Sequence, residues 1–452
     1  MTAEEWFGFP RGAWLVISVE FWERFSFYGM LSILALFLTA SPDQGGFGWP
    51  ASTGLAFVGG YSGAMYALPA FGGYLADRLL GRRRAVALGA SCMVLGQVLL
   101  ALPATLTATL GSWLGAPRAF YLAILCLVTG NALMKSTLVV LCGETLGAND
   151  PRREAAYAYY YLGIAIGAML SGVAVGSMAA HVGWHSGFGV AAAGMAVALG
   201  SYLLLARRWL GSIGSTPDRA LPRKTADAGS EKATNAGLEA RRRIGLLLAL
   251  AALLCAFSVG WFQLFGSWLL FIEGHVDRSI FSFVIPVPWF TSMNAAVVIG
   301  LAPLVARLWV RLGARDRRVD ILQKYAFALG MVCIGHLLML VSARSLGAAP
   351  LWMSMIALSL LGVGELVAWT ATYGIVSRAA PAGFASVAMG AWYLLTLGLG
   401  GYLSGFSGSL VDSWGFAATF GLMAGLMGAA CVVALLLRSP LSRLADRAGV
   451  SL

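Results

Sequence analysis

The stretch VEFWERFSFYGM, residues 19–30, places three ionisable side chains inside a long apolar segment. Glu20, Glu23 and Arg24 are three or four residues apart or adjacent, so in a helix they lie close together, with Glu20 sharing a face with both others. A charged side chain that faces the centre of a bilayer costs about 3 kcal/mol or more. We therefore expect these side chains to face a cavity or one another.

The composition around this stretch is that of a multi-pass membrane protein. Of 452 residues, 59% are hydrophobic and 11% are charged, and the mean hydropathy is +0.78, whereas soluble domains are about a quarter charged. Apolar runs of about 20 residues are long enough to cross a hydrocarbon core. Twelve such spans are expected, near 12–38, 53–76, 84–104, 119–143, 155–177, 187–207, 244–272, 286–310, 322–343, 351–377, 385–406 and 415–437.

The distribution of Lys and Arg predicts the orientation. Basic residues gather in the loops that follow the even-numbered spans, such as DRLLGRRR at 77–84, and in the C-terminal tail, whereas ASPDQGGFGWPAS at 40–52 and AAHVGWHSG at 179–187 contain none. The positive-inside rule then predicts a multi-pass protein of the inner (plasma) membrane with both termini in the cytoplasm. The net charge of +11 follows from this topology and from contact with anionic lipid, so no nucleic-acid partner is expected.

One strong change in composition suggests the domain organisation. Residues 209–243 are rich in Ser, Ala, Gly and charge, which predicts a cytoplasmic linker with some helix near its end. The linker separates an N-terminal six-helix bundle at 1–208 from a C-terminal six-helix bundle at 244–452. GGYLADRLLGRRR at 72–84 resembles APLVARLWVRLGAR at 302–315, as expected of two repeated halves.

Other function classes find little support in the residues. The six cysteines all fall within predicted spans and the four histidines are scattered, so neither a disulfide framework nor a metal site is expected. We find no paired nucleophile and base and no phosphate-binding loop, so an enzyme is not expected. The acidic start MTAEEWFGFPRG does not predict a cleavable signal peptide.

Five segments together resemble the proton-dependent oligopeptide transporters, a branch of the major facilitator superfamily. EFWERFSFYGM at 20–30 resembles the family's ExxERFxYYG signature, and GGYLADRLLGRRRA at 72–85 resembles the superfamily's loop motif. The stretches 130–164, 286–313 and 362–396 resemble the family's fourth and fifth, eighth, and tenth and eleventh spans. The resemblance implies an all-α membrane protein of the major facilitator fold, with twelve transmembrane helices in two six-helix halves. It also implies proton-coupled symport of di- and tripeptides or similar small zwitterions by alternating access.

The resemblance implies roles for individual residues. Arg24 and Lys135 match the basic pair that holds the peptide carboxylate, and Glu365 matches the acid that holds the amino group. A zwitterion needs such anchors of opposite charge, and charge-assisted hydrogen bonds are the strong ones. Glu20 and Glu23, beside Arg24, match acids tied to proton coupling, with protons as the coupling ion and no cofactor. Further substrate-binding or gate positions are Tyr28, Tyr66, Asn294 and Trp392, and the loop motif supplies the gating residues Asp77 and Arg78.

The sequence also departs from the family pattern. Leu31 stands where the family has an Arg, and Gln263 stands where it has the acid that pairs with that Arg. Ala165 replaces a pocket Asn, and Trp369 replaces a small residue after the span-ten acid. These changes leave three alternatives open: a relative retuned to a non-peptide solute, a transporter with weak or no proton coupling, and a transport-dead sensor. Membrane lipid is the expected partner, and a monomer is the expected state.

Overall fold

The computed structural model describes residues 5–103, 116–146, 150–217, 230–314, 319–379, 385–448 and 450. Each predicted span coincides with one helix or with a run of helical pieces. The helices of the first half are α1 (Arg11–Thr39), η1 (Pro42–Gln44), α2 (Ala51–Ala67), α3 (Pro69–Leu75), η2 (Ala76–Leu80), α4 (Arg82–Ala101), α6 (Ala116–Glu144), α7 (Arg153–His181) and α8 (Trp184–Trp209).

The second half of the sequence continues the same pattern. Its helices are α9 (Ser230–Phe262), η3 (Gln263–Phe265), α10 (Ser267–His275), α11 (Trp289–Ala314), α12 (Ile321–Ser342), α13 (Leu351–Ala379), α14 (Ala385–Tyr393), η4 (Leu394–Gly398), α15 (Leu399–Gly408), α16 (Val411–Leu436) and α17 (Arg438–Arg447). The strands are two residues long: β1 (Glu5–Trp6) pairs with β2 (Phe9–Pro10), β3 (Val276–Asp277) with β6 (Ala349–Pro350), and β4 (Ser279–Ile280) with β5 (Phe283–Val284). The predicted helix near the end of the linker is present, because α9 begins at Ser230.

Three of the twelve predicted spans are interrupted, and two of them, the second and the eleventh, are left without a helix long enough to cross a membrane. Within the described residues, ten helical stretches are by themselves long and apolar enough to cross a membrane. The second span divides into α2, α3 and η2, with α2 ending at Ala67 just before Pro69, whose ring lacks the N–H that would continue the helix. The eleventh span divides into α14, the π-turn η4 and α15. The breaks explain why length alone does not identify these two spans in the structure.

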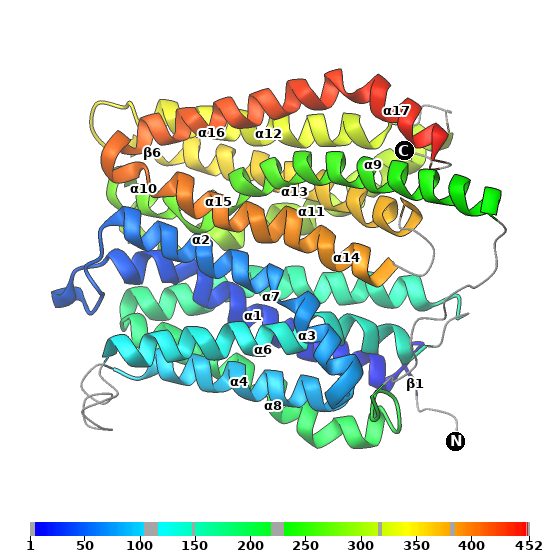
Figure 1. Ribbon diagram of the computed structural model, residues 1–452. Coiled ribbons are helices and arrows are strands. Elements are labelled where there is room, and N and C mark those ends of the chain that lie inside the picture. The colour runs from blue at the N-terminus through cyan, green and yellow to red at the C-terminus, as the bar shows by residue number, and fades with distance from the viewer. Residues whose placement is uncertain are drawn as a thin grey trace. The chain divides into compact units, whose positions relative to one another are not determined.

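Contacts between residues divide the chain into two compact units. The first unit contains 1–54, 64–219 and 278–299, and the second contains 55–63, 220–277 and 300–452. In the first unit α1 packs against α7 and α8, and α4 packs against α6 and α8. In the second, α12 packs against α13 and α16 (Figure 1). The boundary predicted at 209–243 stays a prediction, and two short segments cluster with the unit built mainly from the other half of the sequence.

Close backbone contacts join the two short segments, 55–63 and 278–299, to the units with which they cluster. Within the second unit, a Cβ atom on Gly59 of α2 would lie 2.2 Å from the Cα of Gly405 in α15, and one on Gly405 would lie 2.7 Å from the Cα of Gly59. Within the first unit, a Cβ on Gly176 of α7 would lie 2.5 Å from the Cβ of Pro288, just before α11. Only glycine allows such an approach, so these residues set the distance between the paired segments.

Candidate functional site

The charged residues of α1 form a buried network in the first unit. The exposed fractions of Glu20, Glu23 and Arg24 are 1%, 2% and 1%. The Arg24 guanidinium pairs with the Glu23 carboxylate, and its Nε lies 3.5 Å from Oε1 of Glu20. The sequence-based expectation that these side chains face one another is therefore confirmed.

Helix α6 extends this network with an amide and a second cation. Arg24 Nη2 donates to Oδ1 of Asn131 at 3.3 Å, and Asn131 Nδ2 donates to the carbonyl of Met65 at 2.7 Å. Lys135 lies one turn further along α6, half-buried, within range of the charges of Arg24 and the two acids. Its Nζ is 5.4 Å from the centre of the Tyr66 ring. Glu20, Glu23, Arg24 and Lys135 carry no net charge together when all are ionised.

We call Glu20, Glu23, Arg24 and Lys135 the α1–α6 charge cluster. Aromatic side chains surround it. The Cζ atom of Arg24 lies 4.8 Å from the Phe27 ring centre and 5.9 Å from that of Tyr28, distances at which a ring face attracts a cation. The buried Tyr160 of α7 hydrogen-bonds to Glu20. The Oε2 atom of Glu20 is buried and has no hydrogen-bond partner within the geometric limits among the described residues.

The residues predicted from the second half are distributed over both units. Glu365, half-buried in α13 of the second unit, accepts a 2.8 Å hydrogen bond from the indole Nε1 of Trp261. Trp392 of α14 is buried, and its indole N–H has no partner in the described part of the chain. Asn294 of α11 is buried in the first unit. That Glu365 and the α1–α6 charge cluster share one cavity stays a prediction.

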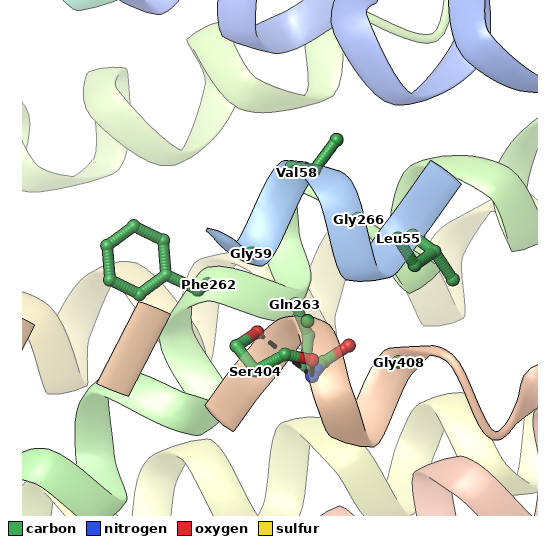
Figure 2. Close-up of a pocket in the computed structure, with 9 residues that line it drawn as sticks. Leu55, Val58, Gly59, Phe262, Gln263, Gly266, Ser404 and Gly408 are labelled. Atoms are coloured by element: carbon green, nitrogen blue, oxygen red, sulfur yellow. Dashed lines mark hydrogen bonds between the residues drawn. The ribbon is translucent and has the colours of Figure 1, made fainter. Parts of the chain in front are cut away.

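Gln263 occupies a break in the seventh span. After α9, η3 covers Gln263–Phe265, and Gly266 has non-helical angles (φ −132°, ψ −107°) before α10. Gln263 Nε2 lies 3.0 Å from the carbonyl oxygen and 3.0 Å from the hydroxyl of Ser404 (Figure 2). It also lies 3.0 Å from the hydroxyl of Ser407. The Ser267 hydroxyl donates to its Oε1 at 2.5 Å. Because the Ser404 carbonyl can only accept, the amide orientation is fixed, and this neutral side chain is satisfied within the second unit without an ionic partner.

A narrow pocket of the second unit borders the same break. Its lining comes from α2, the end of α9, η3 and α15: Leu55, Val58, Gly59, Phe262, Gln263, Gly266, Ser404, Gly405 and Gly408 (Figure 2). None of the predicted substrate-binding residues lines this pocket. Gln263 does line it, and this is a position at which the sequence is expected to depart from the family's ionisable pair.

Replacing Gln263 should measurably destabilise the second unit. A Gln263→Leu variant loses every hydrogen bond of the amide and leaves buried serine hydroxyls with fewer partners, which should lower the free energy of unfolding by about 1–3 kcal/mol. The measurement is the thermal midpoint of the purified protein. Gln97→Leu is the matched control, since Gln97 is also buried but, within the described ranges, its side chain makes a single hydrogen bond, of 3.5 Å to the Ser26 carbonyl. Equal midpoints for the two variants would contradict the expectation.

Arg82 centres an ion-pair network at the predicted cytoplasmic end of the first unit. Its Nε lies 2.8 Å from Oδ1 of Asp77, and its Nη1 contacts Glu144 at the end of α6. The sequence assigned gating to Asp77 and Arg78; the structure places Arg82, four residues beyond Arg78, against Asp77. The role of Asp77 and Arg78 in gating stays a prediction. Local sequence could not single out Arg82 among three consecutive arginines, because Glu144 lies 62 positions away.

Removing Arg82 should loosen this end of the first unit. An Arg82→Ala variant leaves Asp77 and Glu144 without this shared cation, and we expect the thermal midpoint to fall by about 2–4 °C. Arg84→Ala is the control, because Arg84 carries the same charge two residues later and is exposed. The expectation fails if Arg84→Ala lowers the midpoint as much as Arg82→Ala does.

Comparison with known proteins places this geometry in a family. The model of the POT family matches residues 83–226 and 220–423, which is most of the chain. The chain belongs to the POT family. The peptide transporter YePEPT of Yersinia enterocolitica is 27% identical to it, over 90% of this chain and 89% of the relative. A di-/tripeptide transporter of Lactococcus lactis is 26% identical, over 87% of this chain and 88% of the relative.

Solved POT structures have the same fold. The peptide transporter POT in complex with sulfate superposes with a TM-score of 0.87 at 24% identity, over 98% of this chain and 97% of that chain. A POT family transporter in complex with 5-aminolevulinic acid gives 0.86 at 22% identity, over 97% and 98%. The predicted all-α membrane protein of the major facilitator fold is therefore confirmed. That Leu31 and Gln263 depart from the family pattern stays a prediction.

Sequence reasoning missed three residues that support the predicted ones. Asn131 lies four residues before Lys135, on the same face of α6, so helical spacing could have identified it. Tyr160 and Trp261, the hydrogen-bond partners of Glu20 and Glu365, are distant in the sequence. No local signal marks either of them.

Proposed function

We propose that this POT-family chain moves di- and tripeptides across the membrane together with protons, by alternating access. Membership of the POT family supports the transport class, and the peptide transporters among its relatives support the substrate class. The observation that carries the proposal is the α1–α6 charge cluster, in which two cations and two acids are held together inside a membrane protein. Ionisable residues within spans usually serve a transport pathway.

In this proposal the cluster supplies both binding and coupling. Arg24 and Lys135 are the two cations that hold the peptide carboxylate. Glu20 and Glu23 lie beside them and can replace the carboxylate as counter-ions when the peptide leaves. Glu365, with Trp261 orienting its carboxylate, holds the amino group. Glu20 and Glu23 take up the coupling proton, since protonating either acid frees part of Arg24 for the substrate. Protons are the only coupling ion, and no cofactor is needed.

The surroundings of the proposed transporter follow from the charge distribution. We place the chain in the inner membrane with both termini in the cytoplasm, because Lys and Arg concentrate in the loops on that side. Lipid is its partner on the outer faces of the spans, and the transporter acts as a monomer.

A second substrate class is a smaller amino acid-like zwitterion. Ala165 of α7 lacks the amide that the family pattern places there, which removes one contact to a peptide backbone. Trp369 does not decide between the classes, because its ring is buried edge-to-face against Phe257, with centres 6.1 Å apart. A smaller solute can still bind to both charged anchors and does not need the amide contact that Ala165 cannot make.

Uptake of labelled dialanine into proteoliposomes tests the proposal. We expect uptake that unlabelled dialanine competes away, that an inward pH gradient accelerates, and that a Glu365→Gln variant reduces. Uptake of labelled 5-aminolevulinic acid without uptake of dialanine would favour the smaller zwitterion. Absence of transport for both solutes in folded protein would instead favour a sensor that retains the fold.

A further inference from the structure

Two phenylalanines have an unusual backbone conformation. Among the described residues, only Phe7 (φ 48°) and Phe281 (φ 53°) combine a side chain other than glycine with positive φ. Each is at the tip of a two-residue hairpin: Trp6 pairs with Phe9 around Phe7, and Ile280 pairs with Phe283 around Phe281. The exposed fraction of the Phe7 side chain is 90% and that of Phe281 is 102%.

This combination is unfavourable for a hairpin tip in water. Left-handed positions in tight hairpin turns are normally occupied by Gly, Asn or Asp, which adopt positive φ easily. A bulky aromatic residue there is strained, and a fully exposed ring adds apolar surface to water. Strained residues persist where the surrounding structure holds them for a purpose. Two such residues with the same side chain indicate that the rings have a partner outside the chain.

The first hairpin is clamped to the body of the first unit. Arg152 donates to the carbonyl of Gly8 at 2.8 Å and pairs with Glu5 at 2.9 Å, while the Trp14 indole donates to the carbonyl of Trp6 at 2.7 Å. Arg152 also hydrogen-bonds to Asp150, which holds the pKa of that carboxyl below its usual range. Phe7 is therefore presented by a fixed hairpin.

The second hairpin is also fixed to the first unit, by a different set of contacts. Arg278 Nη1 donates to the carbonyl of Ile285 at 2.8 Å, and the Phe283 ring centre lies 5.7 Å from that of Trp289. The Trp289 indole donates to the Ser177 hydroxyl at 2.9 Å, which ties the base of the hairpin to α7. Four of its six exposed side chains are apolar, namely Ile280, Phe281, Phe283 and Val284, and the other two are serines.

The position of the hairpins identifies the partner. Each precedes a helix that is long and apolar enough to cross a membrane, α1 or α11, so both tips are expected near the end of a membrane span. Trp6 and Arg11 flank the first tip, and Arg278 and Trp289 flank the second. Trp and Arg are residues that commonly anchor membrane proteins at the membrane–water interface. No residue between Arg278 and Trp289 is charged, so the tip of the second hairpin carries no charge that would oppose contact with lipid, and the exposed acid Asp277 lies outside it.

We propose that Phe7 and Phe281 are interfacial anchors that insert into the headgroup region of the bilayer, Phe7 in the cytoplasmic leaflet and Phe281 in the opposite one. The partner is lipid. Insertion removes the exposed rings from water, which compensates for the strain at both tips. The two hairpins then fix the depth of α1 and α11 in the membrane.

Hydroxyl-radical labelling of the unmodified protein tests the proposal directly. The protein is placed in nanodiscs that hold a single copy, so no second copy can cover the tips, and labelling of each side chain is corrected for its intrinsic reactivity. Leu346 is the control, because its side chain is 105% exposed in the loop between α12 and α13, between Ser345 and Gly347. We expect Phe7 and Phe281 to be labelled roughly tenfold less than Leu346. Labelling equal to that of Leu346 would overturn the proposal.

A pair of substitutions separates insertion from the shape of the hairpin. Asn adopts positive φ readily, so Phe281→Asn keeps the turn and removes the ring, whereas Phe281→Trp keeps an aromatic anchor. Labelling of Phe283 should rise severalfold in Phe281→Asn and stay at the wild-type level in Phe281→Trp. Unchanged labelling of Phe283 in Phe281→Asn would mean that the hairpin does not depend on this ring for contact with lipid.

Discussion

Uptake of labelled dialanine should fall by at least about a hundredfold when Arg24 is replaced by Ala. Arg24 is the cation for which Glu20 and Glu23 compete, and it also bonds to Asn131. Its removal leaves two buried acids without their main counter-charge, and breaking a buried ion pair in this way costs about 3–5 kcal/mol. It also removes the proposed anchor for the peptide carboxylate. The measurement is the initial rate of uptake at equal amounts of reconstituted protein.

Two controls separate the loss of binding from the loss of folding. Arg24→Lys retains the charge but not the planar fork that contacts two partners, so its rate should lie between those of the wild type and Arg24→Ala. Arg24→Ala combined with Glu23→Gln removes one acid as well and should recover thermal stability without recovering uptake. An Arg24→Ala protein that transports within about threefold of the wild-type rate would exclude Arg24 from the substrate site.

The second large effect concerns proton coupling. We expect an inward pH gradient to accelerate uptake less in this chain than in family members that retain the ionisable pair, because Leu31 and Gln263 cannot bind a proton. Gln263 is satisfied by serines of its own unit, so this position offers no titrating step. A proton can bias two conformations only through a difference in affinity for them. The remaining coupling must pass through Glu20 and Glu23.

A Glu23→Gln variant should therefore lose gradient-driven accumulation and retain exchange of labelled for unlabelled dialanine. Exchange needs substrate binding and the conformational change but no net proton movement, so it serves as the internal control for folding. Glu20→Gln tests the acid whose second oxygen has no hydrogen-bond partner among the described residues. Full accumulation in the double variant Glu20→Gln, Glu23→Gln would refute the assignment and direct attention to Glu365.

Apolar length and helical spacing predicted much of this molecule. Each span could be located because a run of about 20 apolar residues has few alternatives to a membrane helix. The contact between Arg24 and the two acids followed from their spacing within one helix. The ion pair of Arg82 with Glu144 and the hydrogen bond of Trp261 to Glu365 could not be predicted, because each joins different helices.

The break in the seventh span could not be predicted from the sequence either, for a different reason. Pro69 indicates the end of α2 in the sequence, because proline cannot donate a helical hydrogen bond. Nothing comparable marks Gln263–Gly266, where the interruption is stabilised by hydrogen bonds to serines about 140 residues away. A glycine in an apolar span is common, so Gly266 alone did not signal a break.

The direct approach of Gly59 and Gly405 has a consequence for how this sequence can vary. A side chain added at either position meets the backbone of the other, and both positions already carry the smallest residue. A substitution at one position therefore cannot compensate for a change at the other, so the two positions cannot vary together as a larger pair of core side chains can. Gly60, the next residue, has nothing within 4 Å of an added Cβ. A library of variants selected for transport should thus keep glycine at 59 and 405 and accept many residues at 60.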